Sequence, residues 1–333
     1  MLILNKNRVI SKYNKGINFV ENGMMKNYKV MAATGNIFID IWDLIKTTFK
    51  KWNKADPFRQ SAIIAFYAIF SIPALLVIII SIAGYFFGKE AVSGKISQEI
   101  SSMLGDGTAE SIEQMVANAV QTESSALATA FGIGVLLFGA TTVFFELQKS
   151  LNRIWGVEPR PEKAFLKYIR DRFFSFGIIL AIGFLMLVSL ILTSTLAFMG
   201  EWLQALLPDF LLIIFHVLNF LISYGVITVL FALMFKILPD AVVSWKSVWI
   251  GAIVTTFLFE IGKYALGIYF GMAKPESIYG GAGSVVLILL WVSYVCMILF
   301  FGAEFTKQYA IKFGQGIKPK ESAVLVDNNC DNK

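Results

Sequence analysis

The chain has 333 residues, of which 56% are hydrophobic and only 16% are charged. Soluble globular domains are about one quarter charged, so this composition excludes an ordinary soluble domain and predicts a protein that crosses a membrane several times. The net charge of +6 does not predict a nucleic-acid partner, because the cations gather in a few segments, which membrane orientation explains better.

The N-terminal segment, residues 1–35, is polar and has no sustained periodicity, so we expect it to be disordered. About sixty mostly polar residues precede the first long apolar run. This is not the pattern of a cleavable signal peptide.

Residues 36–54 are predicted to form an amphipathic helix. Its apolar residues recur every three or four positions and lysines lie nearby: Phe38, Trp42, Ile45, Phe49 and Trp52, with Lys46, Lys50, Lys51 and Lys54. The pattern is typical of a helix that lies along the inner membrane surface and contacts anionic lipid headgroups. The alternative is a helix that packs on the cytoplasmic face of the helix bundle.

A membrane-spanning helix needs about 20 mainly apolar residues. Six stretches qualify: residues 61–88, 126–148, 173–199, 211–235, 247–270 and 284–305. Strands are too short to explain runs of this length, and backbone polar groups in lipid must be satisfied within the segment. We therefore predict an all-α, polytopic membrane protein with six transmembrane helices, whose membrane domain covers residues 36–312.

The loop after the first span, residues 89–125, carries two apolar stripes at helical spacing. Gly105-Asp106-Gly107 separates the stripes, as a turn would. We expect two short helices here that form a small extracytoplasmic cap on the bundle.

The distribution of cations predicts the orientation. Of the 29 Lys and Arg residues, 25 lie in the segments on one side of the predicted spans and three on the other, with Lys263 inside a span. The positive-inside rule therefore places both termini in the cytoplasm, including a polar tail, residues 313–333, that we expect to be disordered. Cys296 lies in an apolar run and Cys330 in the tail, which does not indicate a disulfide framework.

Several polar or helix-breaking residues fall inside the predicted spans. Pro73 should kink the first span and free a backbone carbonyl. His216 and Asn219 lie one turn apart in the fourth span, which favours a hydrogen bond between helices. Glu260 and Lys263, three residues apart in the fifth span, can pair on one helix face. Since ionisable groups within spans are costly, this pair is either a substrate or proton site or a neutral pair that fixes packing.

Charged and amide side chains collect at the cytoplasmic ends of the second and sixth spans: Glu146, Lys149, Asn152, Arg153, Glu304 and Lys307. Each glutamate has a lysine three residues later, a spacing that predicts ion pairs at the helix ends. A polar cytoplasmic cluster with a function, completed by the Asn-Arg dipeptide, is the alternative.

The segment YGGAGS, residues 279–284, is glycine-rich. It lacks the lysine and the preceding strand of a phosphate-binding loop. We expect Gly280 and Gly281 to permit a tight re-entry of the chain before the sixth span.

Three segments together resemble the YihY/BrkB family of bacterial inner-membrane proteins. They are SAIIAFYAIFSIPALLVIII (61–80), LQKSLNRIWGVEPRP (147–161) and SIYGGAGSVVLILLWVSYVCMILFFGAE (277–304). The resemblance covers roughly residues 40–310 and implies six spans, cytoplasmic termini and a location in the bacterial plasma membrane. It implies no settled activity, because members are linked to serum resistance and to envelope lipid export, and some carry an older label as a transfer-RNA-processing ribonuclease.

The types of residue in the chain argue against a ribonuclease. A metallonuclease needs clustered His and Asp ligands, whereas the chain has a single histidine and its short acidic cluster is Asp40 and Asp43. We expect no enzyme activity, no metal and no cofactor. We expect instead a transporter or exporter of an amphiphilic envelope component with membrane lipids as partners; the alternative is a non-transporting scaffold of an envelope complex. The sequence leaves open whether the chain forms a homo-oligomer.

Overall fold

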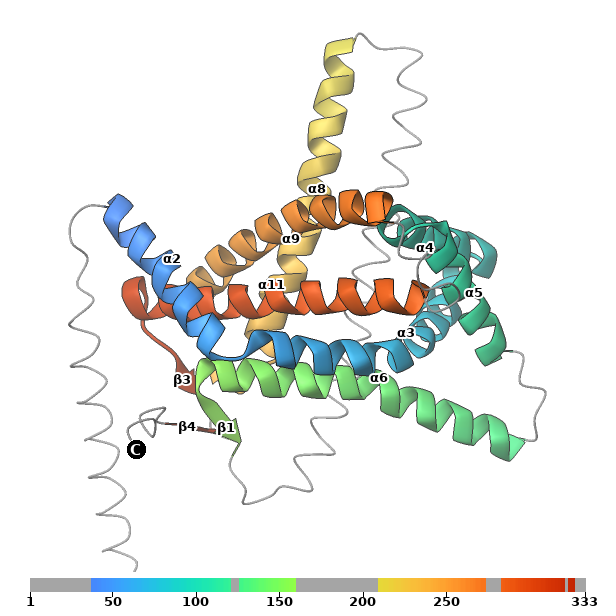
Figure 1. Ribbon diagram of the computed structural model, residues 1–333, viewed down its shortest axis with the longest axis horizontal. Coiled ribbons are helices and arrows are strands. Elements are labelled where there is room, and N and C mark those ends of the chain that lie inside the picture. Colours follow the sequence, from blue (N-terminus) through green and yellow to red (C-terminus); the bar gives the residue numbers. More distant parts are fainter. Residues whose placement is uncertain (1–36, 121–125, 160–208, 274–282, 321–322, 327–333) are drawn as a thin grey trace, which may run out of the picture.

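The computed structural model describes residues 37–120, 126–159, 209–273, 283–320 and 323–326, and this part of the chain is mostly helical (Figure 1). The helices are α2 (Ile37–Lys54), α3 (Pro57–Phe87), α4 (Lys89–Leu104), α5 (Asp106–Val120), α6 (Ala126–Trp155), α8 (Asp209–Ile237), α9 (Trp245–Ala273) and α11 (Gly283–Phe313).

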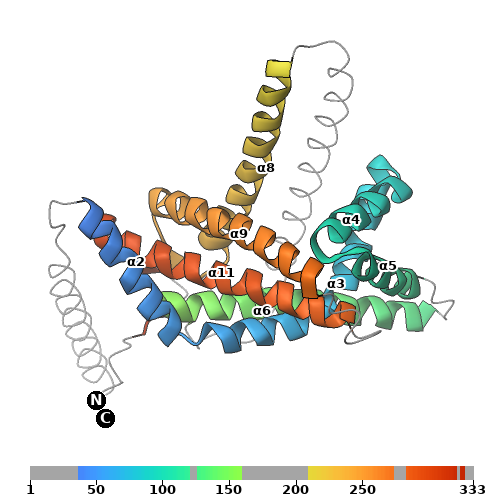
Figure 2. The same ribbon diagram turned by 45° about the horizontal axis from the view of Figure 1, so that its top comes forward.

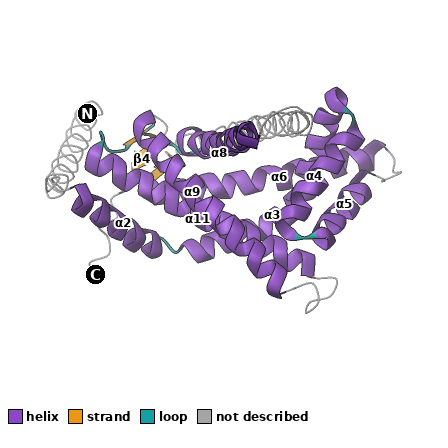
Figure 3. Ribbon diagram, turned by 90° about the horizontal axis from the view of Figure 1, so that it is seen from above, coloured by secondary structure: helices purple, strands orange, loops and turns teal. Residues whose placement is uncertain are grey.

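Helix α11 lies at the centre of the described helices and contacts α3, α6, α9 and α2. Helices α3, α6, α9 and α11 run side by side, and α8 contacts α9 but leans away from the others (Figures 1 and 2). Helix α2 and the short strands lie at one end of the bundle, which we call the strand end. Helices α4 and α5 lie at the opposite end (Figure 3).

Three of the described helices are long and apolar enough to cross a membrane. These segments are Phe220–Ile237, Trp245–Phe270 and Gly283–Phe313, and α3 adds a shorter apolar segment, Pro57–Ile72. They coincide with four of the six predicted spans. The predicted third span, residues 173–199, lies outside the described residues, so the six-span topology stays a prediction.

Helices α9 and α11 approach each other closely at two glycines. A Cβ added to Gly251 would lie 1.8 Å from the Thr306 hydroxyl, and one added to Gly302 would lie 1.8 Å from the Thr255 hydroxyl. Each hydroxyl donates a hydrogen bond of 2.7 Å to the glycine carbonyl four residues earlier in its own helix. The two helices therefore pack through small residues with their threonines satisfied, the arrangement that stabilises helix pairs in membranes.

The largest apolar core lies at the strand end. Trp155, Phe235 and Phe300 are its largest buried side chains, and Leu151 is fully buried beside them. The Trp155 indole N–H donates to the Ala303 carbonyl at 3.0 Å. Since a buried indole needs a partner for its N–H, this bond explains how the C-terminal end of α6 is joined to α11.

The tail is partly ordered, contrary to the expectation of disorder over residues 313–333. Two antiparallel pairs form: β1 (Val157–Pro159) with β4 (Ala323–Leu325), and β2 (Ala241–Val242) with β3 (Lys318–Pro319). The backbone N–H of Val326 donates to the Gly156 carbonyl, and that of Lys320 to the Asp240 carbonyl, both at 2.9 Å. The loops after α6 and α8 thus supply hydrogen-bond partners that the tail sequence alone does not reveal.

Helix α6 ends at a glycine and not at the prolines that follow. Gly156 has a φ of 70°, in the left-handed region that glycine adopts at helix C-termini. The N–H of Gly156 bonds to the Arg153 carbonyl at 3.2 Å, and β1 begins at the next residue.

Helix α2 presents two different faces. Leu44 and Thr48 are buried, and the Asp40 carboxylate forms an ion pair of 3.0 Å with Lys312 of α11. The opposite face exposes large apolar side chains: Phe38, Ile41, Trp42, Ile45 and Phe49. Packing on the bundle is therefore observed, and the exposed apolar face is consistent with the membrane-surface location, which stays a prediction.

One member of the predicted apolar stripe of α2, Trp52, packs on the bundle, as the alternative for this helix expects. The Trp52 indole N–H donates to the Met297 carbonyl at 3.3 Å, and its ring packs edge-on to Phe301. The helical spacing could not show that the stripe turns inward at its C-terminal end, where α2 meets α11.

Candidate functional site

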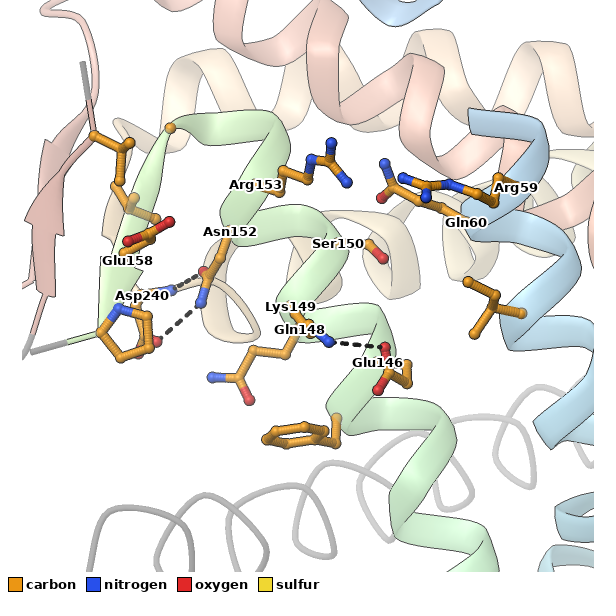
Figure 4. A pocket seen from close by; sticks show the side chains of 16 residues that line it. Arg59, Gln60, Glu146, Gln148, Lys149, Ser150, Asn152, Arg153, Glu158 and Asp240 are labelled. Carbon is orange, nitrogen blue, oxygen red and sulfur yellow. Dashed lines mark hydrogen bonds and ion pairs between the residues drawn. The ribbon is translucent and has the colours of Figure 1, made fainter. Parts of the chain in front are cut away.

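A cavity of about 710 Å³ lies at the strand end between α3 and α6. We call it the α3–α6 cavity. The last turns of α6 supply most of its lining, and the first turns of α3, strand β1, Asp240 and Val326 complete it (Figure 4). Its volume falls in the usual range for small-molecule sites, about 300–1,000 Å³.

An asparagine–aspartate pair joins two of the elements that line the cavity. The Asn152 amide donates to the Asp240 carboxylate at 3.0 Å, and the Asp240 backbone N–H donates to the Asn152 amide oxygen at 2.8 Å. Both residues are buried. Because the two bonds use both the NH2 group and the oxygen of the Asn152 amide, they hold the loop after α8 in a defined position against α6.

Charged side chains surround the opening of the cavity. Lys149, which is exposed, and Glu146, which is partly buried, form an ion pair of 3.7 Å, and Arg59 pairs with Asp56 at 2.8 Å. Arg153 is also exposed, and no residue in the described part of the chain forms an ion pair or side-chain hydrogen bond with it. In Figure 4 the side chains of Arg59 and Arg153 extend toward one another from α3 and α6.

Four residues of the predicted cytoplasmic cluster line this cavity: Glu146, Lys149, Asn152 and Arg153. Glu304 and Lys307 do not, and the ion pair predicted between them is wrong. The buried Glu304 carboxylate accepts a hydrogen bond of 2.6 Å from Gln308, and the Lys307 ammonium donates to the Ile154 carbonyl at 2.7 Å. That carbonyl belongs to the last turn of α6, where unsatisfied backbone oxygens attract a cation.

The intramembrane pair forms as the spacing predicts. The Lys263 ammonium lies 2.7 Å from the Glu260 carboxylate, and both side chains are largely buried. Neither residue lines the α3–α6 cavity. The geometry establishes a neutral pair on α9, and a substrate or proton role for it stays a prediction.

The remaining predicted residues are less defined by the structure. His216 and Asn219 lie one turn apart on α8, but their side chains fall outside the described residues. Helix α3 continues through Pro73 to Phe87, and the predicted kink stays a prediction. Gly280 and Gly281 also lie outside the described part of the chain.

Sequence reasoning missed several lining residues, of which Arg59, Gln60, Glu158, Asp240 and Val326 are the main ones. Arg59 and Glu158 are charges next to predicted spans, which is a weak signal. The others come to the cavity only through long-range pairing. Within the described residues, no group of three or more His, Cys, Asp or Glu side chains is placed to hold a metal ion.

Comparisons with known proteins agree with the resemblance seen in the sequence. The family model described as virulence factor BrkB matches residues 48–324. A UPF0761 membrane protein of Alteromonas mediterranea is 26% identical over 279 residues, which are 84% of this chain and 91% of that protein. UPF0761 membrane proteins of Saccharophagus degradans and Verminephrobacter eiseniae are 28% and 25% identical, over 85% and 84% of this chain, which spans 63% and 65% of their lengths. No solved structure matches the chain.

Proposed function

Since this chain belongs to the virulence factor BrkB family of integral membrane proteins, we propose that it transports an amphiphilic component of the cell envelope. The polar end of this substrate binds in the α3–α6 cavity. The observation that carries the proposal is the position of the cavity, at the end of an apolar bundle and next to an exposed apolar helix face.

The cavity has a mixed lining that suits an amphiphile. Ile63, Phe145 and Val157 supply apolar surface, and the charged side chains of α3, α6 and β1 stand around it. A polar headgroup bound among these charges leaves an acyl chain to be accommodated outside the cavity.

Helix α3 offers a surface for that chain. Ile63 lines the cavity, and Phe66 and Phe70 follow it three and seven residues later, on the same helix face. All three side chains are exposed, and the rings of Phe66 and Phe70 lie 5.3 Å apart. An amphiphile therefore finds a continuous path from the charged cavity to the lipid-like surface of α3.

The test uses purified protein in liposomes that carry a fluorescent phospholipid, with a quencher that reaches only the outer leaflet. Gln148 lines the cavity and Gln98 lies exposed on α4, so Gln148→Trp fills the cavity and Gln98→Trp is its matched control. We expect the wild type and the control to exchange lipid between leaflets faster than protein-free liposomes, and Gln148→Trp to be slow at an unchanged Tm. The measurement is made with and without a proton gradient, because the chain has no ATP-binding motif.

Two results would count against the proposal. A wild type that is no faster than protein-free liposomes under either condition argues against transport of phospholipid-like molecules. A Gln148→Trp variant that equals the wild type argues against the cavity as the binding site.

The alternative function is a non-transporting scaffold of an envelope complex. The observation that favours it is the Glu260–Lys263 pair, whose charges neutralise each other at 2.7 Å and need no substrate. Comparative lipidomics of the two leaflets in cells with and without the protein separates the alternatives. An unchanged lipid distribution favours the scaffold.

A further inference from the structure

Two arginines at the α3–α6 cavity are placed to share one ligand. Arg59 comes from the first turn of α3 and Arg153 from the last turn of α6, and their side chains extend toward one another across the cavity (Figure 4). Guanidinium groups bind phosphate oxygens through two parallel N–H···O bonds, which gives phosphate a geometric advantage over a simple point charge.

The charges around these arginines show which of them lacks a partner. Asp56 pairs with Arg59, and Glu146 pairs with Lys149. Among the described residues, no side chain pairs with Arg153 or with Glu158, which lies on β1 at the other side of the cavity (Figure 4). Since Asp56 already compensates the charge of Arg59, the uncompensated cation at the cavity is Arg153, and an anion between the two guanidinium groups would be attracted mainly by it.

We propose that Arg59 and Arg153 bind the phosphate of a phosphodiester lipid headgroup, and that Glu158 accepts a hydrogen bond from an ammonium or hydroxyl group beyond that phosphate. The assignment of the phosphate to a lipid rests on the proposed function. The two-arginine site itself rests only on the geometry of the cavity.

The balance of charge favours a diester over free phosphate. The cavity is lined by three cations, Arg59, Lys149 and Arg153, and by three acidic residues, Glu146, Glu158 and Asp240. A phosphodiester has a single negative charge and meets little repulsion from these carboxylates. Inorganic phosphate is partly a dianion at neutral pH, so it is repelled more strongly.

The stripe on α3 supports a lipid as the source. The first turn of α3 places Arg59 at the positive end of the helix dipole, which attracts an anion, and Ile63 begins the exposed apolar face one turn later. A phosphate bound by Arg59 therefore lies next to the residue at which the apolar surface for an acyl chain begins.

Binding to the full-length protein in a maltoside detergent, which carries no phosphate, tests the inference by calorimetric titration. The probes are dihexanoyl phosphatidylethanolamine, dihexanoyl glycerol without a phosphate, and inorganic phosphate. The variants are Arg153→Gln, Arg153→Lys and the double variant Arg59→Gln/Arg153→Gln. Lys246→Gln is the control, because Lys246 is exposed at the start of α9 and outside the cavity.

We expect saturable binding of the phospholipid that Arg153→Gln weakens about 10-fold or more, the loss of one charge-assisted hydrogen-bonded contact. Arg153→Lys should be weakened less, the double variant should show no binding, and Lys246→Gln should match the wild type. Dihexanoyl glycerol should bind weakly and equally to all variants.

Three outcomes would overturn the inference. Unchanged phospholipid binding in a double variant with wild-type Tm removes the arginines from the site. Inorganic phosphate that binds as tightly as the phospholipid removes the lipid assignment. Dihexanoyl glycerol that binds as tightly as the phospholipid removes the phosphate. Phospholipid binding without lipid movement in liposomes refutes the proposed transport and leaves this inference standing. Lipid movement that is unchanged in the double variant refutes the role of the two arginines and leaves the proposed transport standing.

Discussion

The buried ion pair between Asp40 of α2 and Lys312 of α11 should contribute strongly to the attachment of helix α2 to the bundle. Asp40 and Lys312 form this pair at 3.0 Å, with side-chain exposures of 5% and 3%. The Lys312 ammonium also donates to the Asp40 backbone carbonyl at 3.0 Å. The perturbation is Asp40→Asn, which keeps the shape of the side chain and removes its charge, together with Lys312→Met and the double variant.

The magnitude follows from the distance and the burial. Two unit charges 3.0 Å apart attract by about 5 kcal/mol at an effective dielectric constant near 20, and the cost of removing both from water offsets much of this gain. Breaking the pair from one side removes the ion-pair partner of the other buried charge, which costs about 3–5 kcal/mol. The double variant contains no buried charge here, so it should recover more than half of the loss caused by either single variant.

Unfolding in detergent, followed by tryptophan fluorescence against temperature and against urea, measures these effects. Lys46→Met is the control, because Lys46 is an exposed lysine on the same helix. We expect both single variants to lower Tm by several degrees and the control to leave it unchanged. If the double variant loses as much stability as the two single losses added together, the side chains are not coupled and the reasoning is wrong.

Three further predictions test the helix packing, the intramembrane pair and the topology. Gly302→Ala should destabilise the protein by about 1–3 kcal/mol, because the new Cβ would lie 1.8 Å from a threonine hydroxyl of α9; Gly267→Ala, whose Cβ would meet no atom within 4 Å, should not lower Tm. Glu260→Gln alone should leave Lys263 as a costly uncompensated charge, on the order of 3 kcal/mol on insertion scales. Adding Lys263→Met should restore most of the Tm. A double variant that is stable and also complements an envelope-stress phenotype fully would remove the pair from the mechanism. Cys330 should resist an impermeant thiol reagent applied to intact cells, and efficient labelling would overturn the predicted cytoplasmic C-terminus.

The sequence predicted the parts of the fold that depend on local pattern. Hydropathy located α8, α9 and α11, because a helix that crosses lipid must be apolar along its whole length. Two helices form after α3 as expected, but Gly105 alone separates them, with a positive φ, and Asp106 and Gly107 already belong to α5. The Glu260–Lys263 pair formed because both partners lie on one helix face, three residues apart.

What the sequence missed depends on contacts between distant segments. Lys307 has a glutamate three residues before it, but its ammonium bonds to a carbonyl of α6 that lies 153 positions away in sequence. The spacing that predicted Glu260 and Lys263 correctly therefore failed here, because the end of α6 offered a backbone acceptor that no local pattern shows. The strands of the tail were missed for the same reason.

The α3–α6 cavity and the charged pair on α9 differ in how their charges are compensated, and this difference supports the cavity as the proposed ligand site. On α9 the carboxylate and the ammonium lie 2.7 Å apart, so a ligand would have to replace an ion pair that is already formed. At the α3–α6 cavity the guanidinium of Arg153 has no side-chain partner among the described residues, so the phosphate that we propose would replace no protein partner of Arg153. The tail contributes a wall of this cavity through Val326, which bonds to the loop after α6. The residue that follows strand β4 therefore lines the cavity, although the sequence alone predicted a disordered tail.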